Sequence, residues 1–245
     1  MSRTTFHIPR VFLLALAVVL AVGGLYREEL WVLSRMNVKK TVEDRVREYG
    51  GAVHARFGGK WEQLGVAYPP EKIVLLGFKA EKKLEVWVGG KEGGIKHLTT
   101  YPILAASGVL GPKLKEGDRQ VPEGIYRIEA LNPNSLFHLS LRVNYPNEFD
   151  RARALEEGRT DPGSDIMIHG KSVSIGCLAV GDAAVEDLFV LAAESGIERI
   201  ELVLSPVDFR NRDLPSHAGN GPAWVPELYA EIRRVLRALF PETVG

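Results

Sequence analysis

The sequence predicts an α+β fold in which a β-rich core carries flanking helices. Three observations lead to this class. Short β-rich runs separated by turns fill the chain from residue 72 to residue 143, helical patterns return after residue 180, and no internal repeat or low-complexity linker divides the two parts. Strands first, followed by a mixture of helix and strand, are typical of one α+β domain.

The first 26 residues have the pattern of an export signal. Arg3 and Arg10 precede an uncharged run over residues 11–26. A positive segment followed by an apolar one is typical of a signal peptide. The run is short for a spanning helix, which needs about 20 residues, but an uncleaved membrane anchor stays open. We therefore expect an exported protein of the periplasm or cell envelope, with membrane association through residues 1–26.

Residues 27–70 are expected to form a helical linker or support. Apolar side chains recur three or four positions apart over Leu30–Trp61, with charged side chains between them, which is a helical period. The pair Gly50–Gly51 would weaken or break this helix. The segment either packs on the catalytic domain expected at residues 71–245 or spaces that domain from the membrane.

The strands are expected where β-branched and aromatic residues gather between turns rich in Gly, Lys and Glu. These runs are Lys72–Phe78, Leu84–Val88, His97–Ala106, a strand that ends near Ile128, and Leu136–Val143.

Helices and strands alternate after residue 180. Asp182 is suited to cap a helix over residues 183–194, and Gly196 stands where a left-handed C-terminal cap belongs. Residues 198–204 have the pattern of a strand, and residues 226–240 that of a final amphipathic helix.

Charge and cysteine content narrow the function classes. The formal net charge is zero, so there is no electrostatic case for binding nucleic acid or a polybasic association with a membrane surface. The single cysteine among 245 residues excludes an intrachain disulfide framework.

That cysteine, Cys177, lies eight positions after His169 with Gly176 directly before it. Residues 165–169 have the pattern of a short buried strand that delivers the histidine to its end, and Gly170 allows the chain to turn back. A nearby imidazole is the usual means of activating a thiol near neutral pH. The spacing therefore predicts a catalytic pair joined by one tight loop.

Two other interpretations of the cysteine stay open at this point. A lone cysteine is often a small buried hydrophobe. A metal site would need His138, His169, Cys177 and His217 to converge, and no two of these have the close spacing typical of zinc ligands.

Five ordered blocks resemble the L,D-transpeptidase catalytic domain family of the YkuD type, and within it the YafK-like branch. The resemblance covers roughly residues 73–210. The blocks are Gly117–Asp118 with Val121–Tyr126, Asn132–Pro133, Leu139–Leu141, Asn144–Asn147, and His169–Gly170 with Gly176–Cys177. The resemblance implies a β-rich YkuD-like catalytic domain with flanking helices and no cofactor.

The chain departs from the wider family in three places. The loop between the upstream histidine and the cysteine is much shorter here than in the wider family. The family usually carries a Ser-His-Gly-Cys box, and Ile175 stands here at the place of its histidine. The family also often has an arginine two residues past the cysteine, where this chain has Ala179. The upstream histidine that the family assigns as base corresponds to His169, so the dyad is kept, and the shorter loop is a feature of the YafK-like branch.

By resemblance, the substrate is the stem peptide of peptidoglycan. Cys177 as thiolate would attack the carbonyl at the L-centre of diaminopimelate, with His169 as general base and acid. No acid neighbours His169, so a backbone carbonyl near Gly170 is expected to fix its tautomer. The N–H groups around Gly176 and Cys177 are expected to form the oxyanion hole.

Three further residues are expected near the substrate. Tyr145 and Arg210 are predicted to contact the substrate. For Arg210 the reason is that a guanidinium binds a carboxylate, here that of diaminopimelate, through two hydrogen bonds. A surface ion pair of Arg210 with Asp208 or Asp213 is the alternative. Ser174 either binds substrate or shapes the active loop, while Asp118 and Glu123 are expected to stabilise a turn.

The sequence leaves the acyl acceptor open. An amine acceptor from a second stem peptide or a wall-linked protein would make the chain a transpeptidase. Water as the acceptor would make it a carboxypeptidase, or an amidase that detaches protein from peptidoglycan. A non-catalytic wall-binding module with the same fold is the hypothesis of a different class.

Overall fold

The computed structural model describes residues 39–90, 92–215 and 221–241. The chain divides into two compact units, residues 1–40 and 41–245, and every helix and strand named below belongs to the second. The expected signal peptide or anchor at residues 1–26 lies outside the described residues. Among those that are described, no helix is both long enough and apolar enough to cross a membrane.

Eight strands of the described part form one mixed sheet. Their order is β3 (Lys96–Pro102), β2 (Lys83–Gly89), β1 (Lys72–Phe78), β8 (Ile200–Ser205), β4 (Gly124–Ser135), β5 (His138–Val143), β6 (Met167–His169) and β7 (Leu178–Ala179). The pairs β1–β8 and β6–β7 are parallel, and the others are antiparallel. The expected α+β class is confirmed.

The sheet curls until its two ends meet. Beyond β3, Ala105 forms an antiparallel bridge with Ala179 of β7, and Leu104 N donates to Ala179 O at 2.8 Å. Strand β7 therefore has β6 on one side and the segment that follows β3 on the other. This closure places residues 105–107 beside the loop that carries Cys177.

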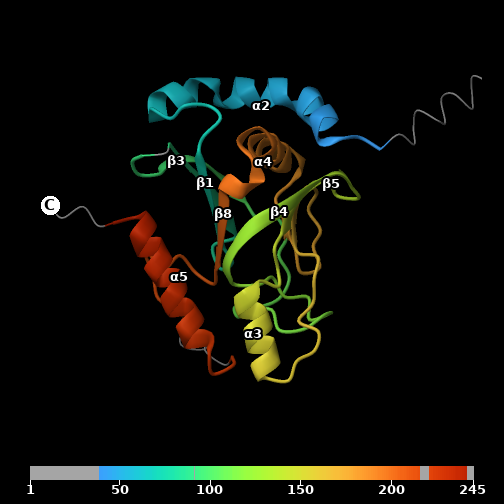
Figure 1. The fold of residues 1–245 in the computed structure, drawn as a ribbon, viewed down its shortest axis with the longest axis vertical. Helices are drawn as coiled ribbons and strands as arrows, with labels where there is room; N and C mark the ends of the chain where they lie inside the picture. The colour runs from blue at the N-terminus through green and yellow to red at the C-terminus, as the bar shows by residue number, and fades with distance from the viewer. Residues whose placement is uncertain (1–38, 91, 216–220, 242–245) are drawn as a thin grey trace, which may run out of the picture. The chain divides into compact units, whose positions relative to one another are not determined.

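Helices cover both faces of the sheet (Figure 1). On one face, α2 (Val42–Leu64) and α4 (Asp182–Ser195) share a core with Ile73 and Leu75 of β1. On the other face, α5 (Val225–Leu239) packs on Val74 and Leu76. Because successive side chains of a strand point to opposite faces, a central strand with both faces covered is apolar throughout. This explains the unbroken apolar run in the sequence of β1.

Helix α2 is shorter at its start than the sequence predicted. Residues 39–41 are not helical, and the helix begins at Val42 behind a capping box formed by Thr41 and Asp44. The cap satisfies amide groups that would otherwise lack partners. The glycine pair Gly50–Gly51 does not break the helix, which runs on to Leu64 because Val53, Phe57 and Trp61 bury one side of it.

The residues change from a helical to a β-rich pattern at about residue 70, where the boundary between support segment and catalytic domain was expected. Helix α2, which precedes this position, packs on the domain that follows it. Arg56 of α2 pairs with Asp187 of α4 at 2.7 Å, and the compact unit already starts at Thr41. A support helix that packs on the domain was one of the two alternatives.

Two details of the later elements differ from expectation. Helix α4 starts at Asp182 behind Gly181, without a side-chain cap, because the Asp182 carboxylate instead accepts from Lys171 N at 2.8 Å. Gly196 has positive φ, but its ψ of 129° is outside the left-handed helical region. The strand at residues 200–205 and the final helix follow the predicted positions closely.

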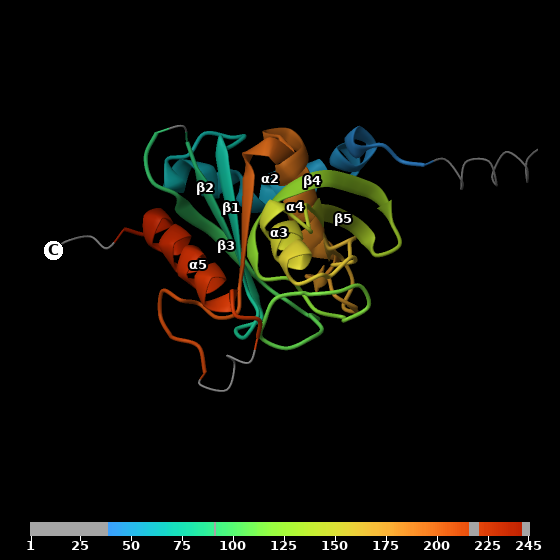
Figure 2. The ribbon, with the colours of Figure 1, turned by 60° about the horizontal axis from the view of Figure 1, so that its bottom comes forward.

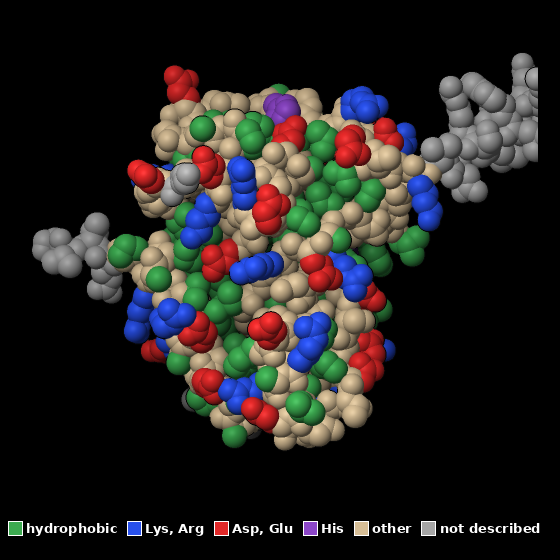
Figure 3. Space-filling model, viewed as in Figure 1, with side chains coloured by type: hydrophobic (Ala, Val, Ile, Leu, Met, Phe, Trp, Pro, Cys, Tyr) green, Lys and Arg blue, Asp and Glu red, His purple; other side chains and the backbone are tan. Residues whose placement is uncertain are grey.

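Helix α3 (Glu148–Glu156) was not predicted from the sequence, and it lies beside the start of α5 (Figure 2). Arg153 of α3 and Glu227 of α5 pair at 2.6 Å. Acidic and basic side chains are interspersed over the face drawn in Figure 3, which agrees with the zero net charge.

Candidate active site

Strands β6 and β7 bring His169 and Cys177 to one face of the sheet. In their parallel register, His169 is the partner of Ala179, and Cys177 precedes Ala179 by two residues. Register partners share a face, and so do residues two apart in a strand. Cys177 directly precedes β7, so the register places it on the same side of the sheet as His169, and among the described contacts no hydrogen bond joins the thiol to the imidazole. Such bonds are often long before substrate binds.

The His169 ring is oriented by its neighbour. Its Nδ1 lies 2.6 Å from the carbonyl oxygen of Gly170. Because a carbonyl only accepts, Nδ1 carries the proton and Nε2 is left as the basic nitrogen. The backbone carbonyl expected at this place is present.

Burial keeps the imidazole neutral. His169 is 2% exposed, and the Phe137 ring lies over it with centroids 4.6 Å apart. Burial lowers the pKa of His169 below its usual value, and the Gly170 carbonyl opposes this only in part. The histidine is therefore available as a base at neutral pH.

Gly170 is a steric requirement at this place. A Cβ there would lie 2.5 Å from Asp182 Oδ1 and 2.7 Å from the carbonyl oxygen of Phe137. Neither neighbour is the end of a long flexible chain, so a side chain would displace the carbonyl that holds His169.

Cys177 is half-buried and rests as a neutral thiol. Its Sγ accepts from Met167 N at 3.4 Å and lies 3.6 Å from the carbonyl oxygen of Asp165. Burial raises the pKa of the Cys177 thiol, and the N–H of Met167 opposes that rise. At rest, the neutral thiol is therefore favoured over the thiolate that was expected to attack the substrate.

Two serine hydroxyls occupy the N–H groups that were expected to form the oxyanion hole. Gly176 N donates to Ser107 Oγ at 2.6 Å, and Cys177 N donates to Ser174 Oγ at 2.9 Å. Ser174 Oγ also donates to the carbonyl oxygen of Cys177 at 2.5 Å. Of its two expected roles, shaping the loop is therefore the one the geometry supports.

Ser107 is a residue that sequence reasoning missed. It lies 70 positions before Cys177 in the chain, and no local spacing relates the two. Its place beside Gly176 depends on the bridge between Ala105 and Ala179. Gly176 itself has φ +93°, a conformation that favours glycine.

Tyr145 does not reach the site surface. It is 3% exposed, and its hydroxyl donates to the carbonyl oxygen of Pro162 at 2.8 Å. Burial raises the pKa of Tyr145 far above its usual value. The expectation of a substrate contact is corrected: Tyr145 supports the segment that leads into β6, because its hydroxyl is already used within the core.

Arg210 is held by carboxylates of its own chain. Its guanidinium contacts Asp208 at 2.7 Å and Glu85 at 2.9 Å and lies 4.8 Å from the centroid of the Phe240 ring. Burial would lower its pKa, but hydrogen bonds to Asp208 and Glu85 raise the pKa overall. The structure therefore does not bring it to the dyad, and the alternative of an ion pair with Asp208 is the one observed.

The other titratable residues have structural partners. His138 Nε2 lies 2.8 Å from Glu186, and Asp118 accepts from Lys113 Nζ and from Leu114 N, which stabilises the turn as expected. Among the described residues, no group of three or more His, Cys, Asp or Glu has the arrangement of a metal site. His217 lies outside the described residues.

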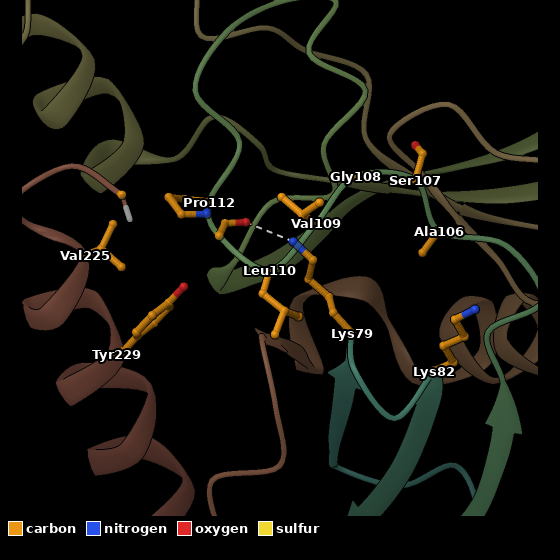
Figure 4. A pocket seen from close by; sticks show the side chains of 12 residues that line it. Lys79, Lys82, Ala106, Ser107, Gly108, Val109, Leu110, Pro112, Val225 and Tyr229 are labelled. Atoms are coloured by element: carbon orange, nitrogen blue, oxygen red, sulfur yellow. Dashed lines mark hydrogen bonds between the residues drawn. The ribbon is translucent and has the colours of Figure 1, made fainter. Parts of the chain in front are cut away.

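A cleft of about 610 Å³ borders the loop that carries Cys177. Figure 4 shows Lys82 at one end, Val225 and Tyr229 of α5 at the other, and the segment Ala106–Pro112 along its length. Ser107 belongs to this lining and also contacts Gly176 N. The cleft therefore adjoins the loop of Cys177, and neither His169 nor Cys177 is part of its lining.

The model of the L,D-transpeptidase catalytic domain, of the YkuD type, matches residues 73–200, which is more than half of the chain. The chain belongs to this L,D-transpeptidase family. The matched region contains both His169 and Cys177, and the resemblance stated from the five sequence blocks is confirmed.

This L,D-transpeptidase-family chain is also 37% identical over 114 residues to the Escherichia coli K12 protein named "Putative L,D-transpeptidase YafK". The same identity holds for the protein of that name from Escherichia coli O157:H7. The match covers 46% of this chain and 44% of each relative, so the chain matches less than half the length of these relatives.

Solved structures with partial similarity include the helical cell shape determining protein Pgp2 of Campylobacter jejuni. It is 21% identical with a TM-score of 0.46, covering 56% of this chain and 48% of that one. L,D-transpeptidase 1 of Mycobacterium tuberculosis is 15% identical with a TM-score of 0.32, covering 55% and 62%. Both TM-scores are below 0.5, and the family assignment rests on the sequence matches. Family membership supports an L,D-transpeptidase-like role related to peptidoglycan.

Proposed function

We propose that this chain is a cysteine-dependent L,D-transpeptidase that acts on peptidoglycan stem peptides through a thioester on Cys177. The observation that carries the proposal is the shared face of His169 and Cys177, with Nε2 of the histidine left basic by the Gly170 carbonyl. A nucleophile beside an oriented base is the arrangement that acyl transfer needs.

The first half-reaction forms the thioester. Cys177 Sγ attacks the carbonyl carbon at the L-centre of diaminopimelate, and its proton passes to His169 Nε2. The C–N bond then breaks, and the leaving amine takes that proton. A neutral thiol and a neutral imidazole are a competent starting pair because the proton moves as the bond forms.

The second half-reaction returns the free thiol. An acceptor amine, from another stem peptide or a wall-linked protein, attacks the thioester carbonyl and gives a proton to His169, which returns it to the departing sulfur. Oxyanion donors lie in the same loop, at Gly176 and Cys177. In the resting structure Ser107 and Ser174 occupy these N–H groups, so the developing oxyanion would take their place.

Export is part of the same proposal, because stem peptides lie outside the cytoplasmic membrane. Its support is the charge and hydropathy pattern of residues 1–26. We infer a periplasmic or envelope location for the catalytic unit.

The proposal is tested by incubating the full chain with diaminopimelate-containing muropeptides and following products by mass spectrometry. Wild type should form dimers or exchange a terminal D-amino acid, and Cys177→Ala should lose at least ~10³-fold of this rate. Ser172→Ala, at an exposed serine of the same loop, is the matched control and should keep it.

The products separate the alternatives. Cysteine-dependent shortening of the peptide, or release of an attached protein, without dimers or exchange would make the chain a hydrolase on the same dyad. An absence of any Cys177-dependent product would contradict catalysis and favour a wall-binding module.

A further inference from the structure

The cleft beside Ser107 carries an electrostatic bias. Two lysines, Lys79 and Lys82, belong to its lining, and no Asp or Glu is among the residues that line it. The sign of charge in a cleft with low-dielectric walls selects the charge of its ligand. An anionic group is therefore favoured, and the two lysines are not equally available to it.

Lys79 is already satisfied. Its side chain is 7% exposed and pairs with Glu123 at 3.0 Å, and its Nζ also donates to the carbonyl oxygens of Gly111 and Val121, both at 2.9 Å. The three N–H groups of the Lys79 ammonium therefore each have an acceptor, and none is left to bind a ligand.

Lys82 is different. It is exposed on the turn between β1 and β2, and within the part of the chain that the structure describes its ammonium has no ion pair or hydrogen bond. Its neighbour Lys83, by contrast, pairs with Glu85 and Asp208 at 2.9 and 3.2 Å. Lys82 is thus the cation of this cleft that is open to an anionic partner.

The chain's own topology links this lysine to the nucleophile. The carbonyl oxygen of Lys82 accepts from Ile103 N at 2.8 Å, at the start of the segment that bridges β7 and ends at Ser107. Neighbouring strands lie about 4.8 Å apart, so the lining at Ala106 and Ser107 is about one strand spacing from the loop of Cys177. A peptide seated in the cleft therefore lies beside the loop that carries Cys177.

We propose that this cleft binds a carboxylate-bearing part of the peptide substrate, with the Lys82 ammonium as its ionic partner. The proposal rests on the proposed function for the identity of the peptide. The apolar side chains of Val109, Leu110 and Val225 provide a wall for the aliphatic part of the ligand. The ammonium supplies the charge-assisted contact that orients its carboxylate.

The test measures binding without turnover. The full chain carrying Cys177→Ala is titrated by calorimetry with a diaminopimelate-containing tetrapeptide stem, and with the same peptide after every carboxylate has been converted to a carboxamide. Adding Lys82→Gln should weaken binding of the carboxylate peptide about 3- to 10-fold and leave binding of the carboxamide peptide unchanged. Lys82→Arg should restore most of the loss, because it keeps the charge.

Lys96→Gln removes an exposed lysine of β3 outside this cleft and is the matched control. Equal affinities of the Lys82→Gln and Lys82 chains for the carboxylate peptide would overturn the proposal. An equal loss for both peptides would overturn it too, because the effect would not depend on a carboxylate.

Turnover of the chain with Cys177 intact is measured in parallel, which separates the two proposals. A Lys82-dependent preference for the carboxylate peptide over the carboxamide peptide, without turnover, would contradict the proposed function and support the carboxylate site. Turnover without discrimination would contradict the carboxylate site alone.

Discussion

Phe137 covers the ring of His169, the proposed base, and shields it from solvent. It stands at the tip of the hairpin between β4 and β5, is 38% exposed itself, and stacks on the His169 ring. Leu136 beside it is 88% exposed. Phe137 therefore has a role in setting the protonation of the His169 imidazole. Leu136, its apolar neighbour, provides a control.

Replacing Phe137 should raise the pKa of His169. Burial is the main cause that lowers this pKa, so Phe137→Ala should move it up toward its ordinary value. The fraction of protonated imidazole at pH 6 would then increase, and the acid limb of the activity profile would move to higher pH. A titration of the His169 ring followed by NMR measures the shift directly.

Phe137→Leu should preserve most of the cover and the low pKa, and Leu136→Ala should leave the titration unchanged. An identical His169 titration in Phe137→Ala and wild type would show that the aromatic cover does not control the base.

At the scale of elements, helix α3 is capped by the carboxylate of Asp150, whose ionised form is destabilised by burial. Asp150 accepts from Asn147 N at 3.0 Å and completes the capping box of α3. It is 8% exposed, and burial raises its pKa to about 6, with the Asn147 amide opposing the rise. The Asp150 side chain thus caps the start of the helix, while its ionised form at neutral pH lowers the stability of the folded state.

The consequence is a pH-dependent stability with a defined sign. The unfolded carboxyl titrates near 3.8 and the folded one near 6. Below pH 3.8 both are protonated, and between these values the folded state binds more protons, so the contribution of Asp150 to the free energy of unfolding falls as pH rises. From pH 4 to pH 7 the loss is ~2–3 kcal/mol.

Asp150→Asn should remove this dependence and keep an oxygen that accepts from Asn147 N. Relative to wild type, its free energy of unfolding from urea titrations should rise by ~2–3 kcal/mol between pH 4 and pH 7. Glu148→Gln, at an exposed carboxylate of the same turn, should run parallel to wild type. Parallel curves for Asp150→Asn as well would mean that the carboxyl is not perturbed by the fold.

At the scale of the whole molecule, one buried network joins the sheet, the cleft and the last helix. Glu123 is 1% exposed and accepts from Gly111 N at 2.8 Å and from the Tyr229 hydroxyl at 2.7 Å, besides pairing with Lys79. Its partners come from the turn that follows β1, from the segment along the cleft and from α5. The sequence assigned Glu123 only to a turn, and the structure extends this role.

Glu123→Gln should destabilise the fold by about 3–5 kcal/mol, because it leaves the buried Lys79 ammonium without its counter-charge. Tyr229→Phe removes one hydrogen bond to the same carboxylate and should cost about 1.5–3 kcal/mol. Urea unfolding of both variants at pH 7 measures the two losses. A loss below ~1 kcal/mol for Glu123→Gln would contradict a charged pair at this place.

The sequence by itself determined the features whose information is local. The strand β1 and helices α4 and α5 follow from periodicity over a few neighbouring residues. The pair of His169 and Cys177 follows from a short loop that closes between two adjacent strands. The carbonyl of Gly170 was predictable for the same reason, since it is the next residue in the chain.

The tertiary structure alone decided the features that depend on distant partners. Tyr145 and Arg210 carry suitable groups, but Pro162, Asp208 and Glu85 already use them. Ser107 reaches Gly176 only because the sheet curls until the segment after β3 meets β7. Polar side chains are assigned by which partner lies within hydrogen-bonding distance, and that distance is set by closure of the sheet and not by position along the chain.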